Sequence, residues 1–151
     1  MPKKNYDVVI ERGHSDINDR IIDFLKTKIE GHFLDIGANT GWLLEEVPNG
    51  IGIDASPEMV KKSGGKVMLG VAENLPFQDN EFDTVVMSCV LEQCKDWKKA
   101  LKEAQRVGKK VIGINPYPNS PWGELRGWVR SVIPPFGKHE RFDQDRYYFE
   151  I

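Results

Sequence analysis

The chain has 151 residues, a length that predicts one domain with a core large enough to fold without disulfides or metal. Its 21 basic and 23 acidic residues nearly balance, which excludes the broad positive surface that non-specific binding to phosphate backbones requires. Nowhere do 18 apolar residues run together and no apolar stretch follows the N-terminal lysines, so we expect a soluble, cytoplasmic protein without membrane span or signal peptide.

Apolar residues recur with helical or strand periodicity along most of the chain. Residues 16–29 carry an apolar face with charges elsewhere, which predicts a lead-in helix that Gly31 ends. The run at 82–88 is apolar enough to be buried on both faces, as in a parallel sheet. In chain order the expected elements are helix 16–29, strand 32–36, helix 40–47, strand 51–54, a helix from Pro57, strand 66–69, strand 82–88, helix 95–107, strand 110–114, loop 115–121 and helix 122–132.

Two of the expected helices have features beyond periodicity. Ser56 precedes Pro57 and Glu58, which is the order of an N-cap, a first helical residue and a first-turn acid. Helix 95–107 has a well-defined apolar face. Its opposite face contains Lys98, Lys99, Lys102, Glu103 and Arg106, and we expect the lysines of this face to be solvated.

Strands that alternate with helices five times predict an α/β fold. We expect one domain over residues 1–151, built as a three-layer, doubly wound and mostly parallel sheet with helices on both faces. In such sheets ligands bind outside the carboxyl ends of the strands, where the strand order reverses. The loops that would form a site are those after Ile36, Ile53, Leu69, Ser88 and Ile114.

The segment 33–41 reads as a strand that runs into a loop with Gly37 and Gly41. Glycines at such a position let backbone N–H groups approach a ligand closely. The dinucleotide fingerprint G-x-G-x-x-G is absent, because the three residues between these glycines supply no middle glycine. The loop therefore favours a bound ligand and weakens the case for a nicotinamide dinucleotide.

Two carboxylates follow the first two strands. Asp54 ends the second strand, 19 residues after Asp35, where a carboxylate can accept hydrogen bonds from both hydroxyls of a ribose. The alternative for Asp54 is a turn or cap residue, which is weakened because Ser56 already supplies the cap. For Asp35 a ligand contact and a bond to the loop amides stay open.

Four ordered motifs together resemble the class I S-adenosylmethionine-dependent methyltransferases, and within them the small-molecule and ubiquinone-biosynthesis-like branch. The motifs are 34–41 (LDIGANTG), 52–59 (GIDASPEM), 72–77 (AENLPF) and 81–86 (EFDTVV). The resemblance covers about residues 33–115. It implies a Rossmann-like methyltransferase fold, S-adenosylmethionine as cofactor, and in-line transfer of the sulfonium methyl group to a small-molecule acceptor.

Carried over by position, the resemblance implies where each part of the cofactor lies. The loop after the first strand would hold the methionine part, Asp54 the ribose, the residues after 66–69 the adenine, and Ser88 with Cys89 the reacting end. Val71 stands where the family often has an acidic residue, which removes one expected adenine contact. The implied cofactor-binding residues are Asp35, Gly37, Ala38, Asn39, Gly41, Asp54, Ala55, Ala72, Glu73 and Ser88.

The acceptor side is less defined, because methyl transfer requires no obligatory catalytic side chain. Glu92 follows the fourth strand and can act as a general base, with a first-turn helix residue as the plainer interpretation. His139 lies in a segment, 137–142, that resembles the family's acceptor-pocket region, whereas His14 and His32 are expected to be structural or exposed. Either an acceptor lid or ordinary packing explains the aromatic residues Tyr6, Tyr117, Trp122, Trp128, Tyr147 and Tyr148.

The C-terminal end departs from the family pattern. There a segment like 137–142 is followed by another helix and a hairpin that completes seven strands, whereas this chain ends at Ile151. Three expectations stay open: the chain is truncated, the sheet is finished by another subunit, or the sheet is left short; a missing element would leave an open edge that favours a homodimer. Cys89 and Cys94 have neither CxxC spacing nor histidines around them, so they predict buried or half-buried free thiols and no metal site.

Other functions remain as alternatives. One is a non-catalytic module of the same fold that binds the cofactor or a partner, supported by the short C-terminus and the lack of an obvious base. A second is a nicotinamide-dependent oxidoreductase, which the missing glycine disfavours. A nucleic-acid amino-methyltransferase is disfavoured as well, because its catalytic motif follows the fourth strand, whereas the Asn-Pro-Tyr-Pro segment at 115–118 follows the fifth.

Overall fold

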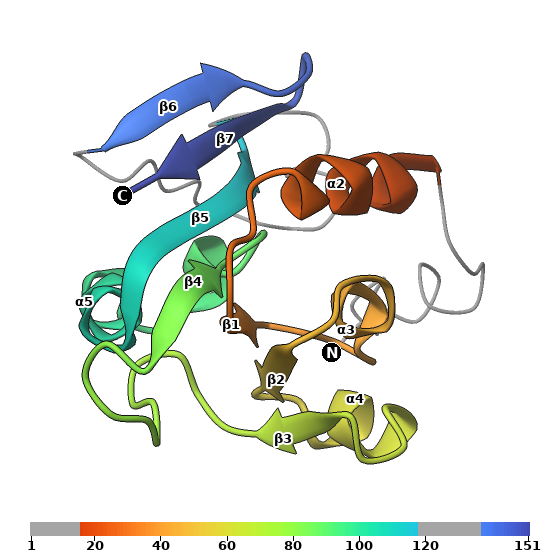
Figure 1. The fold of residues 1–151 in the computed structure, drawn as a ribbon, viewed down its shortest axis with the longest axis vertical. Coiled ribbons are helices and arrows are strands. Elements are labelled where there is room, and N and C mark those ends of the chain that lie inside the picture. The colour runs from red at the N-terminus through yellow and green to blue at the C-terminus, as the bar shows by residue number, and fades with distance from the viewer. Residues whose placement is uncertain (1–15, 118–136) are drawn as a thin grey trace.

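The computed structural model describes residues 16–117 and 137–151 (Figure 1). Its helices are α2 (Asp16–Lys26), α3 (Trp42–Glu46), α4 (Pro57–Lys62), the single 3₁₀ turn η1 (Leu91–Gln93) and α5 (Trp97–Val107). Its strands are β1 (Phe33–Ile36), β2 (Gly50–Asp54), β3 (Val67–Leu69), β4 (Phe82–Val86), β5 (Gly108–Pro116), β6 (Lys138–Arg141) and β7 (Arg146–Glu150). In the parts of the chain that are described, none of the helices has the length and apolar character needed to cross a bilayer.

The strands form one sheet in the order β3-β2-β1-β4-β5-β7-β6. All pairs among β1 to β5 are parallel, while β7 is antiparallel to both β5 and β6. The strand order reverses between β1 and β4, since the chain moves outward through β2 and β3 and then returns to the other side of β1. The predicted α/β fold with a mostly parallel, doubly wound sheet is confirmed, and the reversal point locates the expected ligand site.

The sheet has seven strands, so the expectation of a shortened sheet is wrong. Segment 138–141 is strand β6, and the aromatic tail Arg146–Glu150 returns beside it as β7 and inserts against β5. The edge strand β6 is exposed along its whole length, and its Lys138, Glu140 and Arg141 give it the charged character that protects sheet edges from pairing. The sheet therefore gives no reason of this kind to expect a homodimer.

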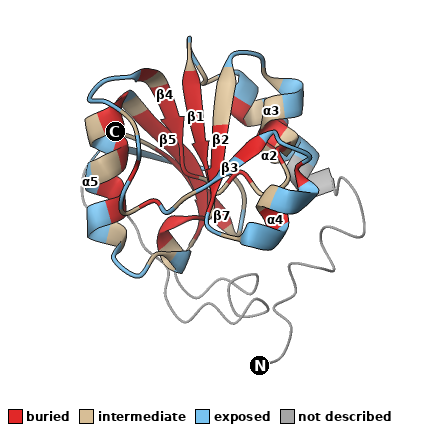
Figure 2. Cartoon of the chain, turned by 90° about the horizontal axis from the view of Figure 1, so that it is seen from below, coloured by how far each residue is buried: buried red, intermediate tan, exposed pale blue. Residues whose placement is uncertain are grey.

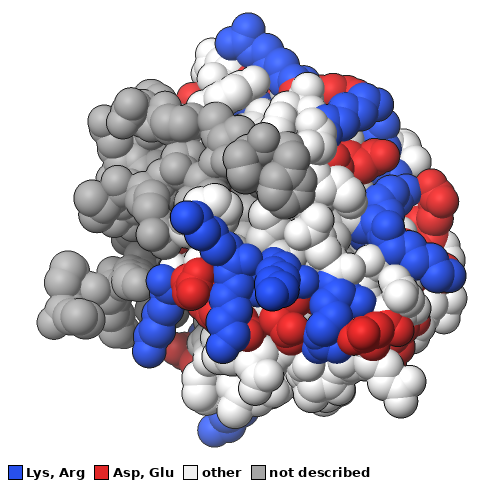
Figure 3. Space-filling view, turned by 90° about the vertical axis from the view of Figure 1, so that its left-hand side faces the viewer, with Lys and Arg blue, Asp and Glu red and all other residues white. Residues whose placement is uncertain are grey.

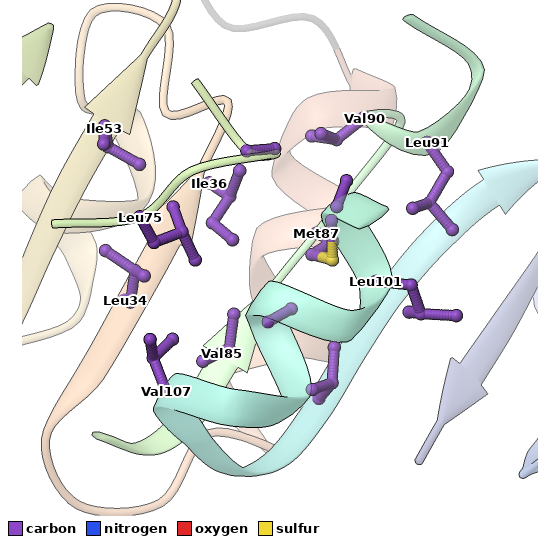
Figure 4. Packing of buried hydrophobic residues seen from close by; sticks show 14 of the residues in the cluster. Leu34, Ile36, Ile53, Leu75, Val85, Met87, Val90, Leu91, Leu101 and Val107 are labelled. Carbon is purple, nitrogen blue, oxygen red and sulfur yellow. The ribbon is translucent and has the colours of Figure 1, made fainter. Parts of the chain in front are cut away.

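Two groups of buried apolar side chains hold the layers together. The first lies between the sheet and α5 and includes Leu34, Val85 and Leu101 (Figure 4). The second lies on the opposite face, under α2 and α3, and includes Leu25 and Phe33. Figure 2 shows the consequence: the central strands β1, β4 and β5 are mostly buried, and the helices are buried only on their inner sides. Apolar burial from both faces explains why these strands are continuous hydrophobic runs.

Local signals placed most element boundaries close to where the structure has them. The Ser56 hydroxyl accepts a hydrogen bond from the Met59 N–H at 3.4 Å, and Pro57 is the first residue of α4, as predicted. Asp96 caps α5 by accepting from the Lys99 N–H at 3.0 Å. The predicted loop 115–121 is wrong at its start, because β5 continues through Pro116, where pairing with β7 extends it. The predicted helix 122–132 lies outside the described residues.

Gly113 of β5 has no room for a side chain, because a Cβ atom there would lie 2.2 Å from the Met87 carbonyl oxygen and 2.7 Å from the Phe149 ring. Gly113→Ala is expected to lower the free energy of unfolding by about 2–4 kcal/mol, since the backbone of Met87, the residue that follows β4, cannot move aside cheaply. Gly64→Ala is the control: its φ of +64° costs about 1 kcal/mol, but no described atom lies within 4 Å of the added Cβ. Equal losses for the two variants in urea unfolding would contradict the packing argument.

Candidate functional site

The expected site residues gather where the carboxyl ends of β1, β2 and β4 meet. The register aligns Asp35 of β1 with Gly52 of β2 and with Val86 of β4, so the loops after all three strands leave the sheet at the same edge. The Gly70 N–H donates to the carbonyl of Asp54 at 3.0 Å, which brings the loop after β3 to the same place. Four of the five predicted loops are thereby adjacent.

The loop after β1 is held in a left-handed conformation. Gly37, Asn39 and Gly41 have φ values of 74°, 52° and 94°, and the N–H groups of Gly37 and Ala38 both donate to the carbonyl of Ile53. A Cβ atom on Gly37 would lie 2.6 Å from the side chain of Val90, so glycine is required there by space as well as by φ. The loop is a tight, pre-formed backbone curve against β2.

Asp54 is buried and its carboxylate is fixed by two backbone donors. The Asn39 N–H donates to Oδ2 at 2.9 Å and the Ser56 N–H donates to Oδ1 at 2.8 Å. The turn contact expected in the structural interpretation is therefore present. Each carboxylate oxygen can accept a second hydrogen bond, so the same geometry leaves capacity for the two hydroxyls of a ribose. The ribose contact stays a prediction.

Asp35 is a buried carboxyl whose pKa is raised to about 8, first by burial and then by the charge of Asp54. Its alternative role, a bond to the loop amides, is not what the structure has, because the N–H groups of Gly37 and Ala38 donate to Ile53 instead. Among the described residues no donor satisfies this carboxyl. A buried acid beside a second acid is suited to a cationic group of a ligand.

Ala72 and Glu73, expected to border the adenine, follow Gly70 and Val71. Ala72 is buried in the core cluster. The Glu73 carboxylate accepts from the N–H groups of Lys95 at 2.9 Å and Asp96 at 3.4 Å, so it is bound to the residues that begin α5. Ala55, the residue after Asp54, is exposed.

Asn115, which is not among the predicted site residues, shapes the turn after β4. Cys89 has a left-handed φ of 56°, and its N–H donates both to the carbonyl of Ile114 at 3.1 Å and to Oδ1 of Asn115 at 3.0 Å. The Ser88 hydroxyl accepts from the Ile114 N–H at 3.3 Å. Asn115 is fully buried and locks this turn, yet its segment had been predicted as loop. Cys89 and Cys94 are half-buried thiols that form no disulfide, as predicted.

Both candidates for the acceptor side lie near Tyr147 of β7. The Glu92 carboxylate oxygens are shielded from solvent, and burial raises the pKa of Tyr147, with the charge of Glu92 adding to the shift. Between ring centroids, His139 lies 6.0 Å from Tyr147 and Tyr117 lies 5.4 Å from Tyr147. Asn115 Nδ2 donates to the Tyr147 hydroxyl at 3.4 Å, which joins this cluster to the end of β4.

The other expected residues are not part of this cluster. Tyr148 is buried on the opposite face of the sheet, so packing explains it better than a lid does. The His32 ring packs against the ring of Phe82 in a tilted arrangement, with 4.9 Å between centroids, and is structural, as expected. Glu92 lies in η1, close to the first-turn position that the plainer interpretation gave it. Four of the residues lie outside the described part of the chain, namely Tyr6, His14, Trp122 and Trp128.

Comparison with known proteins identifies a family for this chain. Residues 34–111, just over half of the chain, match the methyltransferase domain family. The chain belongs to the class I S-adenosylmethionine-dependent methyltransferases. The matched range runs from β1 into β5 and contains every motif that carried the resemblance.

Individual relatives agree with this assignment. The chain is 43% identical over 101 residues to an uncharacterized protein of Methanocaldococcus jannaschii, covering 62% of this chain and 49% of that protein. It is 32% identical over 111 residues to the demethylmenaquinone methyltransferase of Staphylococcus saprophyticus, covering 64% and 48%. A solved structure from Thermotoga maritima, described as an S-adenosylmethionine-dependent methyltransferase and possible histamine N-methyltransferase, is 27% identical with a TM-score of 0.65, covering 82% of this chain and 66% of that one. The chain spans about half the length of the curated relatives.

S-adenosylmethionine is the cofactor of this methyltransferase family, and the residues present fit it. The cofactor carries an ammonium group and a sulfonium, both cationic, and a ribose with two free hydroxyls. The buried carboxyls of Asp35 and Asp54 supply acceptors for such groups, and the left-handed loop between Gly37 and Gly41 leaves the backbone close to them. The sequence motifs thus named residues that the structure brings together at this edge of the sheet, and their contacts with the cofactor stay a prediction. Asn115 gave no such signal, because its hydrogen bond to Cys89 depends on β5 continuing past Ile114.

Proposed function

We propose that the chain transfers the methyl group of S-adenosylmethionine to a small-molecule acceptor. The observation that carries this proposal is the pair of buried carboxyls, Asp35 and Asp54, beside the left-handed loop at the reversal of the sheet. When bound, the cofactor supplies a methyl group on a positively charged sulfur, which is electrophilic without further activation. The protein therefore has to bind, orient and keep water away.

Each part of the proposed site has one task. The loop from Gly37 to Gly41, with Asp35, holds the methionine end, and Asp54 accepts from the ribose hydroxyls. Ala55, Ala72 and Glu73 border the adenine. The turn at Ser88 and Cys89 bounds the reacting end, where the acceptor approaches in line with the bond between sulfur and the methyl carbon.

Glu92 is the proposed general base. Its carboxylate oxygens are shielded from solvent in the cluster around Tyr147, beside the turn that bounds the reacting end. When bound, the cofactor would supply the methyl group and keep the electron pair of the carbon–sulfur bond as a neutral thioether, while Glu92 would accept the proton that the acceptor loses. His139 is exposed at the sheet edge, so we assign it contact with the acceptor at most.

A small molecule is the acceptor class that the relatives favour. The Staphylococcus saprophyticus relative is named for a quinone precursor and the Thermotoga maritima structure for an amine. Figure 3 shows basic and acidic side chains interspersed on the face that it views, without the single-sign surface typical of nucleic-acid binding. A small aromatic or amine acceptor fits the aromatic cluster of Tyr117 and Tyr147.

Turnover on mixed acceptor pools tests the proposal. The protein is incubated with S-adenosylmethionine and either a pool of phenols and quinols or a pool of amines, and S-adenosylhomocysteine is quantified. We expect one pool to give turnover, and Glu92→Gln to lower kcat about tenfold or more at unchanged cofactor affinity. His139→Asn, the comparison variant, is expected to change KM more than kcat. Cofactor binding without turnover on either pool would favour the non-catalytic alternative.

A further inference from the structure

The loop between β3 and β4, residues 70–80, is tied to the sheet at its start. The Gly70 N–H donates to the carbonyl of Asp54, and the Asn74 N–H donates to the carbonyl of Val71 at 3.2 Å, which closes a turn around Ala72 and Glu73. Under the proposed function this turn borders the adenine. Its position is therefore a determinant of cofactor affinity.

Two residues of α5 hold the same loop by hydrogen bonds. Glu103 Oε2 accepts from the Leu75 N–H at 2.8 Å, and Arg106 Nη2 donates to the Leu75 carbonyl at 3.0 Å. Arg106 Nη1 also donates to the carbonyl of Phe77 at 2.8 Å and to Asp79 Oδ1 at 2.9 Å. Both backbone groups of Leu75 are thus held by one pair of side chains, much as a neighbouring strand would hold them.

Glu103 and Arg106 also fix each other. Arg106 Nε and Nη2 donate to the two carboxylate oxygens of Glu103 at 2.7 and 2.9 Å, a bidentate arrangement that fixes the plane of the guanidinium. This hydrogen bond to Arg106 is the main reason that the pKa of Glu103 is lowered. Although both residues lie opposite the apolar face of α5, the Glu103 side chain is only 18% exposed and that of Arg106 is 31% exposed. The lysines of the same face, Lys98, Lys99 and Lys102, are exposed, as expected.

The loop is also fixed by the apolar core and by the residues that begin α5. The Leu75 side chain is 4% exposed and packs in the cluster with Leu34 and Ile53 (Figure 4). The Glu73 carboxylate binds the amides of Lys95 and Asp96 at the start of α5. The loop therefore spans α5 from its first residues to its last turn and cannot shift without breaking charged hydrogen bonds.

We infer that Glu103 and Arg106 are positioning residues for the adenine end of the cofactor, acting through the backbone of Leu75. The inference rests on the proposed function. It assigns to α5, which provides no residue expected to touch the cofactor, control over the position of the loop that borders the adenine.

Dissecting the ligand tests the inference. Affinities of the unsubstituted protein and Arg106→Ala are measured by calorimetry for S-adenosylhomocysteine, for adenosine, and for S-ribosylhomocysteine, which lacks adenine. We expect Arg106→Ala to bind the two adenine-containing ligands about tenfold or more weakly, the equivalent of losing a charged hydrogen bond, and to bind S-ribosylhomocysteine unchanged. Lys102→Ala, an exposed change on the same helix, is expected to alter none of the three affinities.

The other outcomes separate the competing explanations. Equal weakening for all three ligands, or no weakening, would overturn the inference, because a purely structural role cannot select for adenine. If Arg106→Ala does not fold, Arg106→Lys and Glu103→Gln are used, and the same selective loss at reduced size is expected. If the unsubstituted protein binds S-ribosylhomocysteine but neither adenine ligand, the inference fails; if it binds none of the three, the proposed function fails with it.

Discussion

Asp35→Asn is expected to make the free energy of unfolding less dependent on pH than it is in the unsubstituted protein. The carboxyl has a pKa of about 8 in the folded chain and about 3.9 when unfolded, so the folded state holds a proton that the unfolded state releases between these values. Stability from this group is fully present below pH 4 and is lost as the pH rises through 8. The asparagine variant should gain about 2–5 kcal/mol relative to the unsubstituted protein between pH 4 and pH 8.

Urea unfolding at several pH values measures this difference, with Asp83→Asn as the control. Asp83 is a half-buried acid whose pKa is lowered by a hydrogen bond from Lys109, so its removal should change the pH dependence in the opposite sense. The Asp35 carboxyl should also release its proton when a cationic ligand binds. Calorimetry detects this release as a binding enthalpy that varies with the ionisation enthalpy of the buffer. Identical pH profiles for Asp35→Asn and the unsubstituted protein would contradict a buried, protonated Asp35.

Asp54→Ala is expected to weaken S-adenosylhomocysteine binding about a hundredfold or more. The carboxylate is already oriented by the N–H groups of Asn39 and Ser56, so two ribose hydroxyls would find acceptors that need no rearrangement. Removing it deletes both ribose bonds and leaves two backbone donors without their acceptor.

A pair of nucleosides separates the ribose contact from the structural one. The unsubstituted protein should prefer adenosine to 2′,3′-dideoxyadenosine, and the Asp54→Ala variant should bind both equally. Ser56→Ala, which removes the helix cap next to Asp54, should keep the preference. A preference that survives in Asp54→Ala would mean that the carboxylate acts only as a turn residue.

Sequence pattern predicted the parallel half of the fold because each element there has a local cause. Apolar runs predicted β1, β2 and β4, and the cap at Ser56 predicted the start of α4 within a residue. The hairpin of β6 and β7 was missed because its signal is not local. Segment 138–141 is polar and exposed, and the Tyr147 and Tyr148 pair has no alternation, since β7 is buried on both faces between α2 and the acceptor cluster.

The candidate site shows the same division. The backbone loop and the two carboxylates are consecutive with their strands, so motifs revealed them. Arg106 and Asn115 act on residues that are 26 or more positions away in the chain, and nothing near either residue marks such contacts. Residues that position a site through tertiary hydrogen bonds are the ones that periodicity assigns to solvent or loop.

The most direct test of the account is a calorimetric titration of the protein with S-adenosylmethionine, S-adenosylhomocysteine and NAD. We expect the first two to bind with micromolar affinity, Asp54→Ala to abolish this binding at the same concentrations, and NAD not to bind. Binding of NAD alone, or of none of the three, would contradict the assignment of the loop between Gly37 and Gly41 and of Asp54 to this cofactor.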